Sequence, residues 1–209
     1  MLHELGHAVY DLYTPTELPY LLREPAHTLT TEAVAMHFGA LPRDVRWLRD
    51  TVTLDGAQYS GLERTLPASR ARELLVFAHW ALVMIRFEHA FYQDPMRTDM
   101  NRVWWDLVSG IQGLHAPSDA ESRHDWASKI HLAVAPVYYH NYLLGELFAA
   151  QLRARMERES LQGAEIGAFM RTAVFDRGAT LPWQDLVRSA TGDDLSPRYF
   201  ADSLASAAV

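Results

Sequence analysis

Two histidines and a glutamate at the start of the chain have the spacing of a metal-binding helix. Residues 3–7 read HELGH, which places His3 and His7 four positions apart. On a helix such residues share a face, so both imidazoles can point at one ion, and Glu4 can reach a water beside that ion. A catalytic zinc site also needs a third protein ligand and one open position. Taken alone, the pentapeptide is more typical of a surface helix with two solvated histidines than of a metal site.

A third ligand is available on the next expected helix. A helix is expected to open at TTEAVAM, with Glu32 in its first turn and 25 positions after His7. This spacing is typical of sites in which a glutamate on a following helix completes a His–His–Glu set. Among the rivals, Asp11 lies too far along the first helix, Glu24 suits a local cap, and His27 in an expected loop stays an alternative.

A second group of polar side chains occupies residues 129–142. It contains Lys129, His131, Tyr138, Tyr139 and Tyr142. An aromatic stripe of this kind usually packs into a helical core. The mixture with lysine and histidine also suits peptide hydrolysis, where donors face a developing oxyanion and a cation with a phenol holds a carboxylate.

Composition limits the classes of function. The 209 residues are 49% apolar and 22% charged, as in a folded globular chain with a sizeable core. The net charge of −7 argues against a nucleic-acid partner or an anionic membrane surface. The absence of cysteine leaves only His, Asp and Glu as metal ligands. With no run of 18 apolar residues and no signal peptide, we expect no transmembrane segment in this chain.

Helical periodicity covers most of the chain, and no alternating strand pattern recurs. We therefore expect an all-α fold, mostly helical, with residues 1–209 forming a single domain. Helices are expected from a cap at Ser69 to a stop at Pro95, at about 100–111, 136–158 and 164–176, after Pro182 and after Pro197, with 115–128 as a loop. In the first of these, the expected apolar face is Leu74, Ala78, Ala81, Leu82 and Ile85.

Several segments together resemble a known family. HELGH, LPYLLREPA (18–26), TEA (31–33), NRVWWDLVSGIQGL (101–114), SKIHLAVAPVYYHNYLLGELFAAQL (128–152) and LPWQDLVRSATG (181–192) are similar, in the family's order, to the M2 metallopeptidases, the angiotensin-converting-enzyme-like gluzincins. The resemblance implies the C-terminal part of a helical zinc peptidase domain, truncated just before the HExxH helix. It also implies release of C-terminal dipeptides from short peptide substrates.

The resemblance assigns a metal centre to the start of the chain. His3, His7 and Glu32 would bind Zn²⁺, and Glu4 would be the general base and acid.

It assigns further roles to the second group. Lys129 and Tyr139 would hold the substrate's terminal carboxylate, while His131 and Tyr142 would stabilise the transition state. One extra residue between His131 and Tyr139 leaves the choice among Tyr138, Tyr139 and Tyr142 open.

Two positions depart from the family pattern. Asn141 replaces an arginine that binds chloride in animal members, so chloride activation is not expected. Met36 replaces an aspartate behind the zinc site, so a carboxylate that orients a ligand is absent or comes from elsewhere. The other histidines are expected to be structural or solvent-facing: His27, His37, His79, His89, His115, His124 and His140.

Other functions stay open. A thimet-type oligopeptidase or a carboxypeptidase would use much the same residues, and a non-catalytic helical module would keep the motif without activity. A truncated chain is also expected to self-associate through the apolar face left by a missing N-terminal half. The compartment is unknown, and a secreted or periplasmic location is compatible with a longer parent protein.

Overall fold

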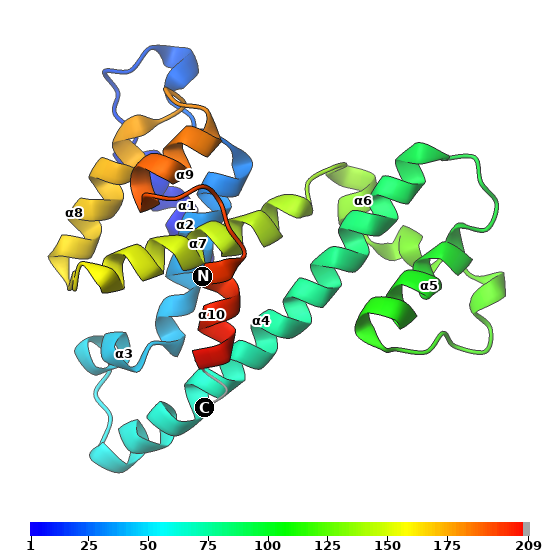
Figure 1. Ribbon diagram of the computed structural model, residues 1–209, viewed down its shortest axis with the longest axis horizontal. Helices are drawn as coiled ribbons and strands as arrows, with labels where there is room; N and C mark the ends of the chain where they lie inside the picture. Colours follow the sequence, from blue (N-terminus) through cyan, green and yellow to red (C-terminus); the bar gives the residue numbers. More distant parts are fainter. Residues whose placement is uncertain (207–209) are drawn as a thin grey trace. The chain divides into compact units, whose positions relative to one another are not determined.

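The computed structural model describes residues 1–206, apart from the side chain of residue 121, and these residues form helices without a β-strand (Figure 1). The all-α prediction is therefore confirmed. The α-helices are α1 Leu2–Tyr13, α2 Thr28–Ala40, α3 Val45–Thr51, α4 Gly56–Gln93, α5 Met100–Gln112, α6 Ile130–Val134, α7 His140–Arg158, α8 Ala164–Ala173, α9 Trp183–Thr191 and α10 Arg198–Ser206. The 3₁₀ turns are η1 Tyr20–Leu22, η2 Leu41–Arg43, η3 Ala120–Ser122, η4 Asp125–Ser128 and η5 Phe175–Arg177.

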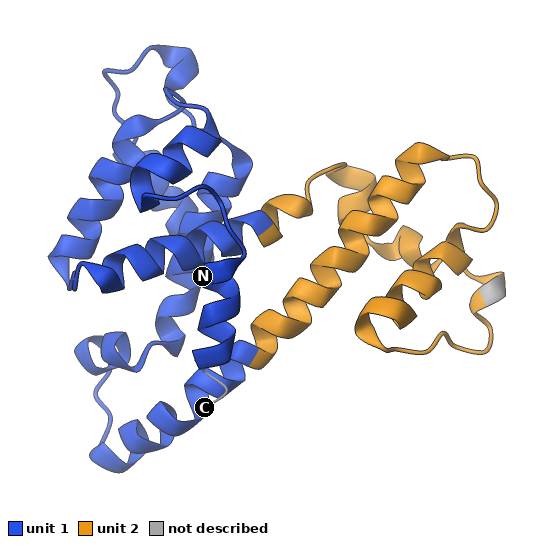
Figure 2. Ribbon diagram, viewed as in Figure 1, with its two compact units in different colours: residues 1–71, 144–209 blue, residues 72–143 orange. Residues whose placement is uncertain are grey.

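The chain forms two compact units (Figure 2). Unit 1 comprises residues 1–71 and 144–209, and unit 2 comprises residues 72–143. Helices α4 and α7 contribute residues to both units. The expectation of one domain over residues 1–209 stays a prediction.

Helix α2 lies in the core of unit 1. Its buried residues occur all around the helix, as expected for a helix surrounded by protein. The core around it draws Tyr10 from α1, Phe148 and Leu152 from α7, Met170 from α8 and Leu186 from α9. Figure 1 shows these helices gathered together. The core of unit 1 thus joins residues between 9 and 38 to residues between 144 and 195.

Unit 2 has its own aromatic core. The second half of α4 contributes Val83, Met84 and Phe87, and α5 contributes Trp104 and Val108. The ring of Phe87 meets that of Trp104 edge to face, with centroids 5.2 Å apart. The predicted helix 100–111 is confirmed as α5.

Helix α4 differs from its prediction in its start and in its buried face. It begins at Gly56 and continues through Pro67, so Ser69 is not its N-cap, although it ends before Pro95 as expected. Its buried residues are Ala81, Val83, Met84, Phe87 and Glu88, whereas Leu82 of the predicted face is 38% exposed. By length and composition alone α4 could cross a membrane, a test that core helices of soluble proteins also pass. The absence of a transmembrane segment therefore stays a prediction.

The helix expected over 136–158 begins later than predicted, at His140. Helix α6 ends at Val134 and α7 begins at His140, because Val137 adopts a left-handed backbone with φ of 55°. The expected helix at 164–176 is α8 followed by η5, and Gly178 follows with φ of 47°. The two expected C-terminal helices are confirmed as α9 and α10. The segment expected as a loop at 115–128 contains η3 and η4.

Candidate metal centre

The side chains of His3, His7 and Glu32 converge in unit 1. The Glu32 Oε2 atom lies 3.5 Å from His3 Nε2 and 3.9 Å from His7 Nε2. One ligand atom from each of the three residues lies within 4.8 Å of the others, and no other such group of His, Asp or Glu occurs in the described part of the chain. Ligands of a tetrahedral zinc ion with bonds of about 2.0–2.1 Å stand roughly 3.4 Å apart. The donor set and its spacing therefore fit one tetrahedral metal ion.

The candidate centre is protein-covered on the glutamate side and open on the imidazole side. The Glu32 side chain is 2% exposed, whereas those of His3 and His7 are 32% and 27% exposed. Glu4, the next residue on α1, is exposed to solvent. A water and a substrate can therefore approach the centre from its imidazole side.

A glycine sets the distance between α1 and α2. A Cβ atom on Gly6 would lie 2.7 Å from the Ala35 Cα atom, a distance that backbone atoms do not tolerate. Glycine therefore permits the close approach that brings the two histidines of α1 to Glu32. Helix α1 begins at Leu2, and Met1 provides no side-chain cap, so His3 lies in an uncapped first turn.

Helix α2 is capped by a histidine. The Leu29 N–H donates to His27 Nδ1 at 3.2 Å, and the Thr30 hydroxyl donates to the His27 carbonyl at 2.7 Å. Helix α2 consequently starts at Thr28, which corrects the prediction that Glu32 lies in its first turn. His27, the alternative third ligand, caps α2 and does not belong to the converging group.

A second glycine fits against Glu32 from α7. A Cβ atom on Gly145 would lie 2.9 Å from Glu32 Cβ and 3.2 Å from the Ala33 nitrogen. The backbone of α7 therefore presses directly on the residue that supplies the carboxylate. The sequence segment around Gly145 gave no signal for this role.

Thr31 holds the second histidine. His7 Nδ1 and Thr31 Oγ1 are 2.7 Å apart. When Nδ1 carries the proton and donates it to this hydroxyl, Nε2 is the free lone-pair nitrogen that faces Glu32. The orienting partner that Met36 cannot supply is thus present as a hydroxyl on the residue before Glu32. The sequence pattern alone indicates no role for Thr31.

The second predicted group assembles in unit 2. His131 Nε2 lies 3.3 Å from the Tyr142 hydroxyl, and the His131 and Tyr139 rings are 5.0 Å apart and nearly perpendicular. The Tyr138 ring is farther from His131, at 6.5 Å. The described geometry therefore pairs His131 with Tyr142 by a polar contact and with Tyr139 by a ring contact.

Lys129 and Tyr139 both contact Trp80, which sequence reasoning did not single out. The Trp80 Nε1–H donates to the Tyr139 hydroxyl at 2.6 Å, and Lys129 Nζ lies 5.4 Å from the Trp80 ring centre. Burial raises the pKa of Tyr139, while the hydrogen bond from Trp80 acts in the opposite direction. Tyr139 is thus a protonated phenol at neutral pH.

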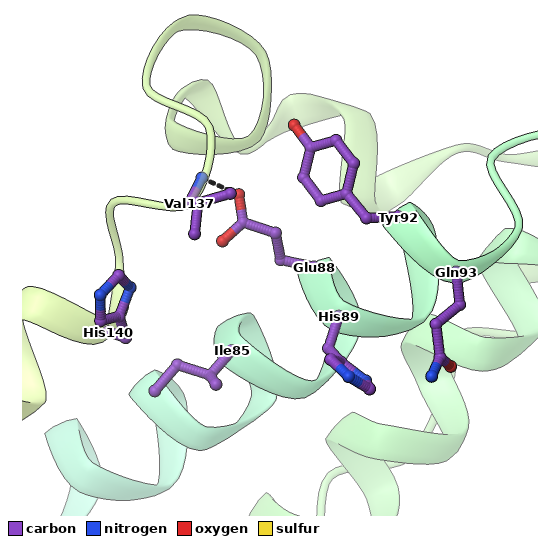
Figure 3. Close-up of a pocket in the computed structure, with 7 residues that line it drawn as sticks. All are labelled: Ile85, Glu88, His89, Tyr92, Gln93, Val137 and His140. Atoms are coloured by element: carbon purple, nitrogen blue, oxygen red, sulfur yellow. Dashed lines mark hydrogen bonds between the residues drawn. The ribbon is translucent and has the colours of Figure 1, made fainter.

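A buried glutamate fixes the turn between α6 and α7. The Val137 N–H donates to the Glu88 carboxylate, as Figure 3 shows. Glu88 also faces a cavity of about 400 Å³, whose other lining residues are Ile85, His89, Tyr92, Gln93, Val137 and His140. The left-handed backbone of Val137 is unfavourable for a β-branched residue, so this contact stabilises a strained turn.

His37 is buried in unit 1, one of the two outcomes expected for the remaining histidines. Burial, together with the positive charges of Arg153 and Arg70, lowers the pKa of His37 to about 4, while Asp44 acts in the opposite direction. His37 is therefore a neutral side chain at neutral pH.

With this geometry described, the chain can be compared with known proteins. The sequence profile of Peptidase family M3 matches residues 1–206. The chain belongs to Peptidase family M3. This match supports M3 rather than the M2 family that the sequence segments resemble. M3 peptidases are generally metalloenzymes, which agrees with the donor set found here.

Relatives of this M3 chain support the fold and extend beyond its length. Thermostable carboxypeptidase 1 of Pyrococcus furiosus is 21% identical over 225 residues, covering 95% of this chain and 44% of that protein. The solved structure described as "BsuCP Crystal Structure" has a TM-score of 0.72 and 19% identity, covering 98% of this chain and 46% of its own. "The Structure of CHT" gives a TM-score of 0.71 and 20% identity, covering 99% and 47%. The chain thus spans less than half the length of these relatives.

Proposed function

We propose that this chain carries the metal centre of a zinc metallopeptidase that hydrolyses short peptides near their C-terminus. The observation that carries the proposal is the convergence of His3, His7 and Glu32, with Glu4 next to His3 on α1. Membership of a peptidase family supports the same reaction class. Imidazole nitrogens and a carboxylate oxygen are the ligands that catalytic zinc uses.

Glu4 is the proton carrier in this proposal. A zinc ion held by the three ligands supplies Lewis acidity, which polarises the scissile carbonyl and acidifies a water. The Glu4 carboxylate accepts the proton of the attacking water and then delivers it to the leaving amine nitrogen, so that one residue is base and acid in turn. The solvent-exposed position of Glu4 on α1 allows both transfers.

The unit 2 residues have proposed roles in binding and in transition-state stabilisation. His131 and Tyr142 supply hydrogen-bond donors to the oxyanion of the tetrahedral intermediate. Lys129 and Tyr139 bind the substrate's terminal carboxylate through a cation and a phenol. These assignments rest on the family resemblance, and their internal contacts in unit 2 are compatible with them.

Two kinds of product distinguish the finer alternatives. Release of C-terminal dipeptides is the activity implied by the M2 resemblance. Release of single residues is the alternative, and the relative from Pyrococcus furiosus is named a carboxypeptidase. Mass spectrometry of a digested nonapeptide separates them, because dipeptide release shortens it by two residues at each step and carboxypeptidase action by one.

Metal content and turnover test the proposed function together. We expect the purified chain to hold about one zinc per molecule and to lose it in Glu32→Ala. Glu4→Gln should keep the zinc and lose roughly 10²–10⁴-fold in turnover, the usual contribution of a general base. Asp11→Asn, which changes another exposed acid on α1, is the matched control and should keep both properties. A fully active Glu4→Gln would overturn the mechanism, and a folded chain without zinc would favour a non-catalytic helical module.

A further inference from the structure

Trp80 contacts both residues that are proposed to bind the substrate's carboxylate. Its indole N–H reaches the Tyr139 hydroxyl, and its ring face lies against the Lys129 ammonium. The Trp80 ring itself meets the buried Trp104 at 80°, with centroids 5.7 Å apart. This packing gives the indole one orientation, and hence fixes the direction of its N–H.

The hydrogen bond from Trp80 determines how Tyr139 is used. An indole nitrogen can only donate, so the Tyr139 oxygen is the acceptor of this bond. The single hydrogen of the phenol is therefore directed away from Trp80 and is available to an acceptor. A carboxylate has only acceptor atoms, whereas a neutral amide presents an acceptor and a donor. The fixed phenol can donate to either group, and the Lys129 charge next to Trp80 favours the carboxylate.

The Lys129 ammonium is held by aromatic faces. Its Nζ atom lies 5.4 Å from the Trp80 ring centre and 5.7 Å from that of Trp104. Within the described residues, no carboxylate lies within salt-bridge distance of Lys129. Cation–π contacts orient an ammonium without neutralising its charge, so the positive charge remains available to an anionic ligand.

We propose that Trp80 is a positioning residue that turns Lys129 and Tyr139 into a fixed pair of donors for a free C-terminal carboxylate. In this role Trp80 sets the preference for peptides with a free C-terminus over the same peptides with a C-terminal amide. The inference rests on the proposed function, because it concerns how that function selects its substrate.

Trp80→Phe tests the role of the indole N–H, because it keeps an aromatic ring and removes the donor. For a free-acid peptide we expect KM to rise roughly tenfold with kcat nearly unchanged. This is the usual size of the effect when one hydrogen bond is lost, here the bond that orients the Tyr139 hydroxyl toward the charged ligand. KM for the amidated peptide should stay the same. Trp105→Phe is the matched control, since its N–H donates to Asp125 in the same unit. An equal change for both peptides, or no change for either, would overturn the inference.

A double-mutant cycle asks whether Trp80 acts through Tyr139. The double variant Trp80→Phe/Tyr139→Phe should be no worse on the free acid than Tyr139→Phe alone. In ¹³C-tyrosine spectra, Trp80→Phe should raise the pKa of the Tyr139 phenol, because the bond from Trp80 lowers it in the native chain. If the losses in affinity of the two single variants add up in the double variant, Trp80 does not act through Tyr139. An unchanged pKa of Tyr139 in a folded Trp80→Phe variant would also contradict a positioning role.

The test separates this inference from the proposed function. If the wild-type chain cleaves neither peptide, the proposed function is wrong for this chain. The affinity of the same two peptides, measured by calorimetry, then tests the role of Trp80. Trp80→Phe must weaken the binding of the free-acid peptide and leave that of the amidated peptide unchanged. If Trp80→Phe does not fold, as judged by the loss of its cooperative thermal transition, Tyr139→Phe tests the same hydrogen bond by removing its acceptor. Unchanged selectivity between the free-acid and the amidated peptide in Tyr139→Phe would overturn the inference.

Discussion

His7 is oriented by its Nδ1 atom as well as by its place on α1. The Thr31 hydroxyl is 2.7 Å from this nitrogen and fixes the imidazole plane. In Thr31→Val the side chain keeps its shape and loses the hydroxyl, so we expect zinc affinity to fall roughly 10–100-fold, the usual cost of losing such a partner. Competition with a chromophoric chelator measures this affinity. Thr65→Val, an exposed change on α4, is the control, and equal affinities for the two variants would contradict the role of Thr31.

His37 should make the stability of the metal-free chain depend on pH. Its pKa is about 4 in the folded state, mainly because of burial, and 6.5 is the ordinary value in the unfolded state. The unfolded chain therefore binds more protons between pH 6.5 and 4, so the free energy of unfolding falls as pH drops through this window. The loss attributable to His37 is at most about 3 kcal/mol.

Urea titrations of the chelator-treated protein at several pH values measure this loss. His37→Gln should flatten the dependence between pH 6.5 and 4, and the exposed His89→Gln should leave it as in the native chain. A native-like slope in His37→Gln would show that other groups cause it.

At the scale of elements, α2 is confined between α1 and α7 by glycines. A Cβ at position 145 would press on Glu32 Cβ at 2.9 Å, so Gly145→Ala has to displace α7 or the carboxylate. We expect a fall in zinc affinity of at least about tenfold, together with a loss of roughly 1–3 kcal/mol in unfolding free energy from overpacking. Gly167→Ala on α8 is the matched control, because its Cβ meets nothing within 4 Å. Native zinc affinity in Gly145→Ala would show that α7 does not fix the carboxylate.

The turn between α6 and α7 gives a prediction of opposite sign. Val137 is 57% exposed and left-handed, so Val137→Gly loses little burial and relieves backbone strain. We expect the free energy of unfolding to rise by about 1 kcal/mol, because the strain of such a residue exceeds the added entropy of glycine in the unfolded chain. Val134→Gly, at an exposed position within α6, should lower it instead. Thermal denaturation of both variants checks the signs, and a destabilised Val137→Gly would contradict the strain.

At the scale of the whole molecule, the three converging residues were predictable from spacing and resemblance, whereas the packing that holds Glu32 was not. The i, i+4 spacing of His3 and His7 follows from one helical turn and needs no other information. The contact of Gly145 with Glu32 joins distant segments, and no local pattern encodes it. Helix α4 was predicted too short because Ser69 is a typical N-cap residue, whereas the helix begins at Gly56 and extends through Ser69. The histidine cap of α2 was missed because His27 is not a usual capping residue.

Self-association stays a prediction for the whole chain. Helix α4 exposes Leu75 and Val76 next to each other, at 49% and 64%. Exposed apolar neighbours of this kind favour contact between copies. We expect light scattering after gel filtration to show a mass above 23.7 kDa that decreases on dilution and in Val76→Glu. A monomer at every concentration, with no binding of a hydrophobic dye, would contradict the prediction.

The order of the two units along the chain has a consequence for biosynthesis. Helices α1 and α2 emerge from the ribosome before α7, which covers α2 in the unit 1 core and follows only after most of unit 2. At a synthesis rate of about 5–20 residues per second, α7 is made several seconds after the apolar helix α2, which lacks its packing partner during that time. Residues 72–143 have all their unit 2 partners by then and can fold during this interval. The metal centre is therefore expected to be completed late, and a nascent chain stalled after residue 143 should bind zinc poorly although it already contains every ligand.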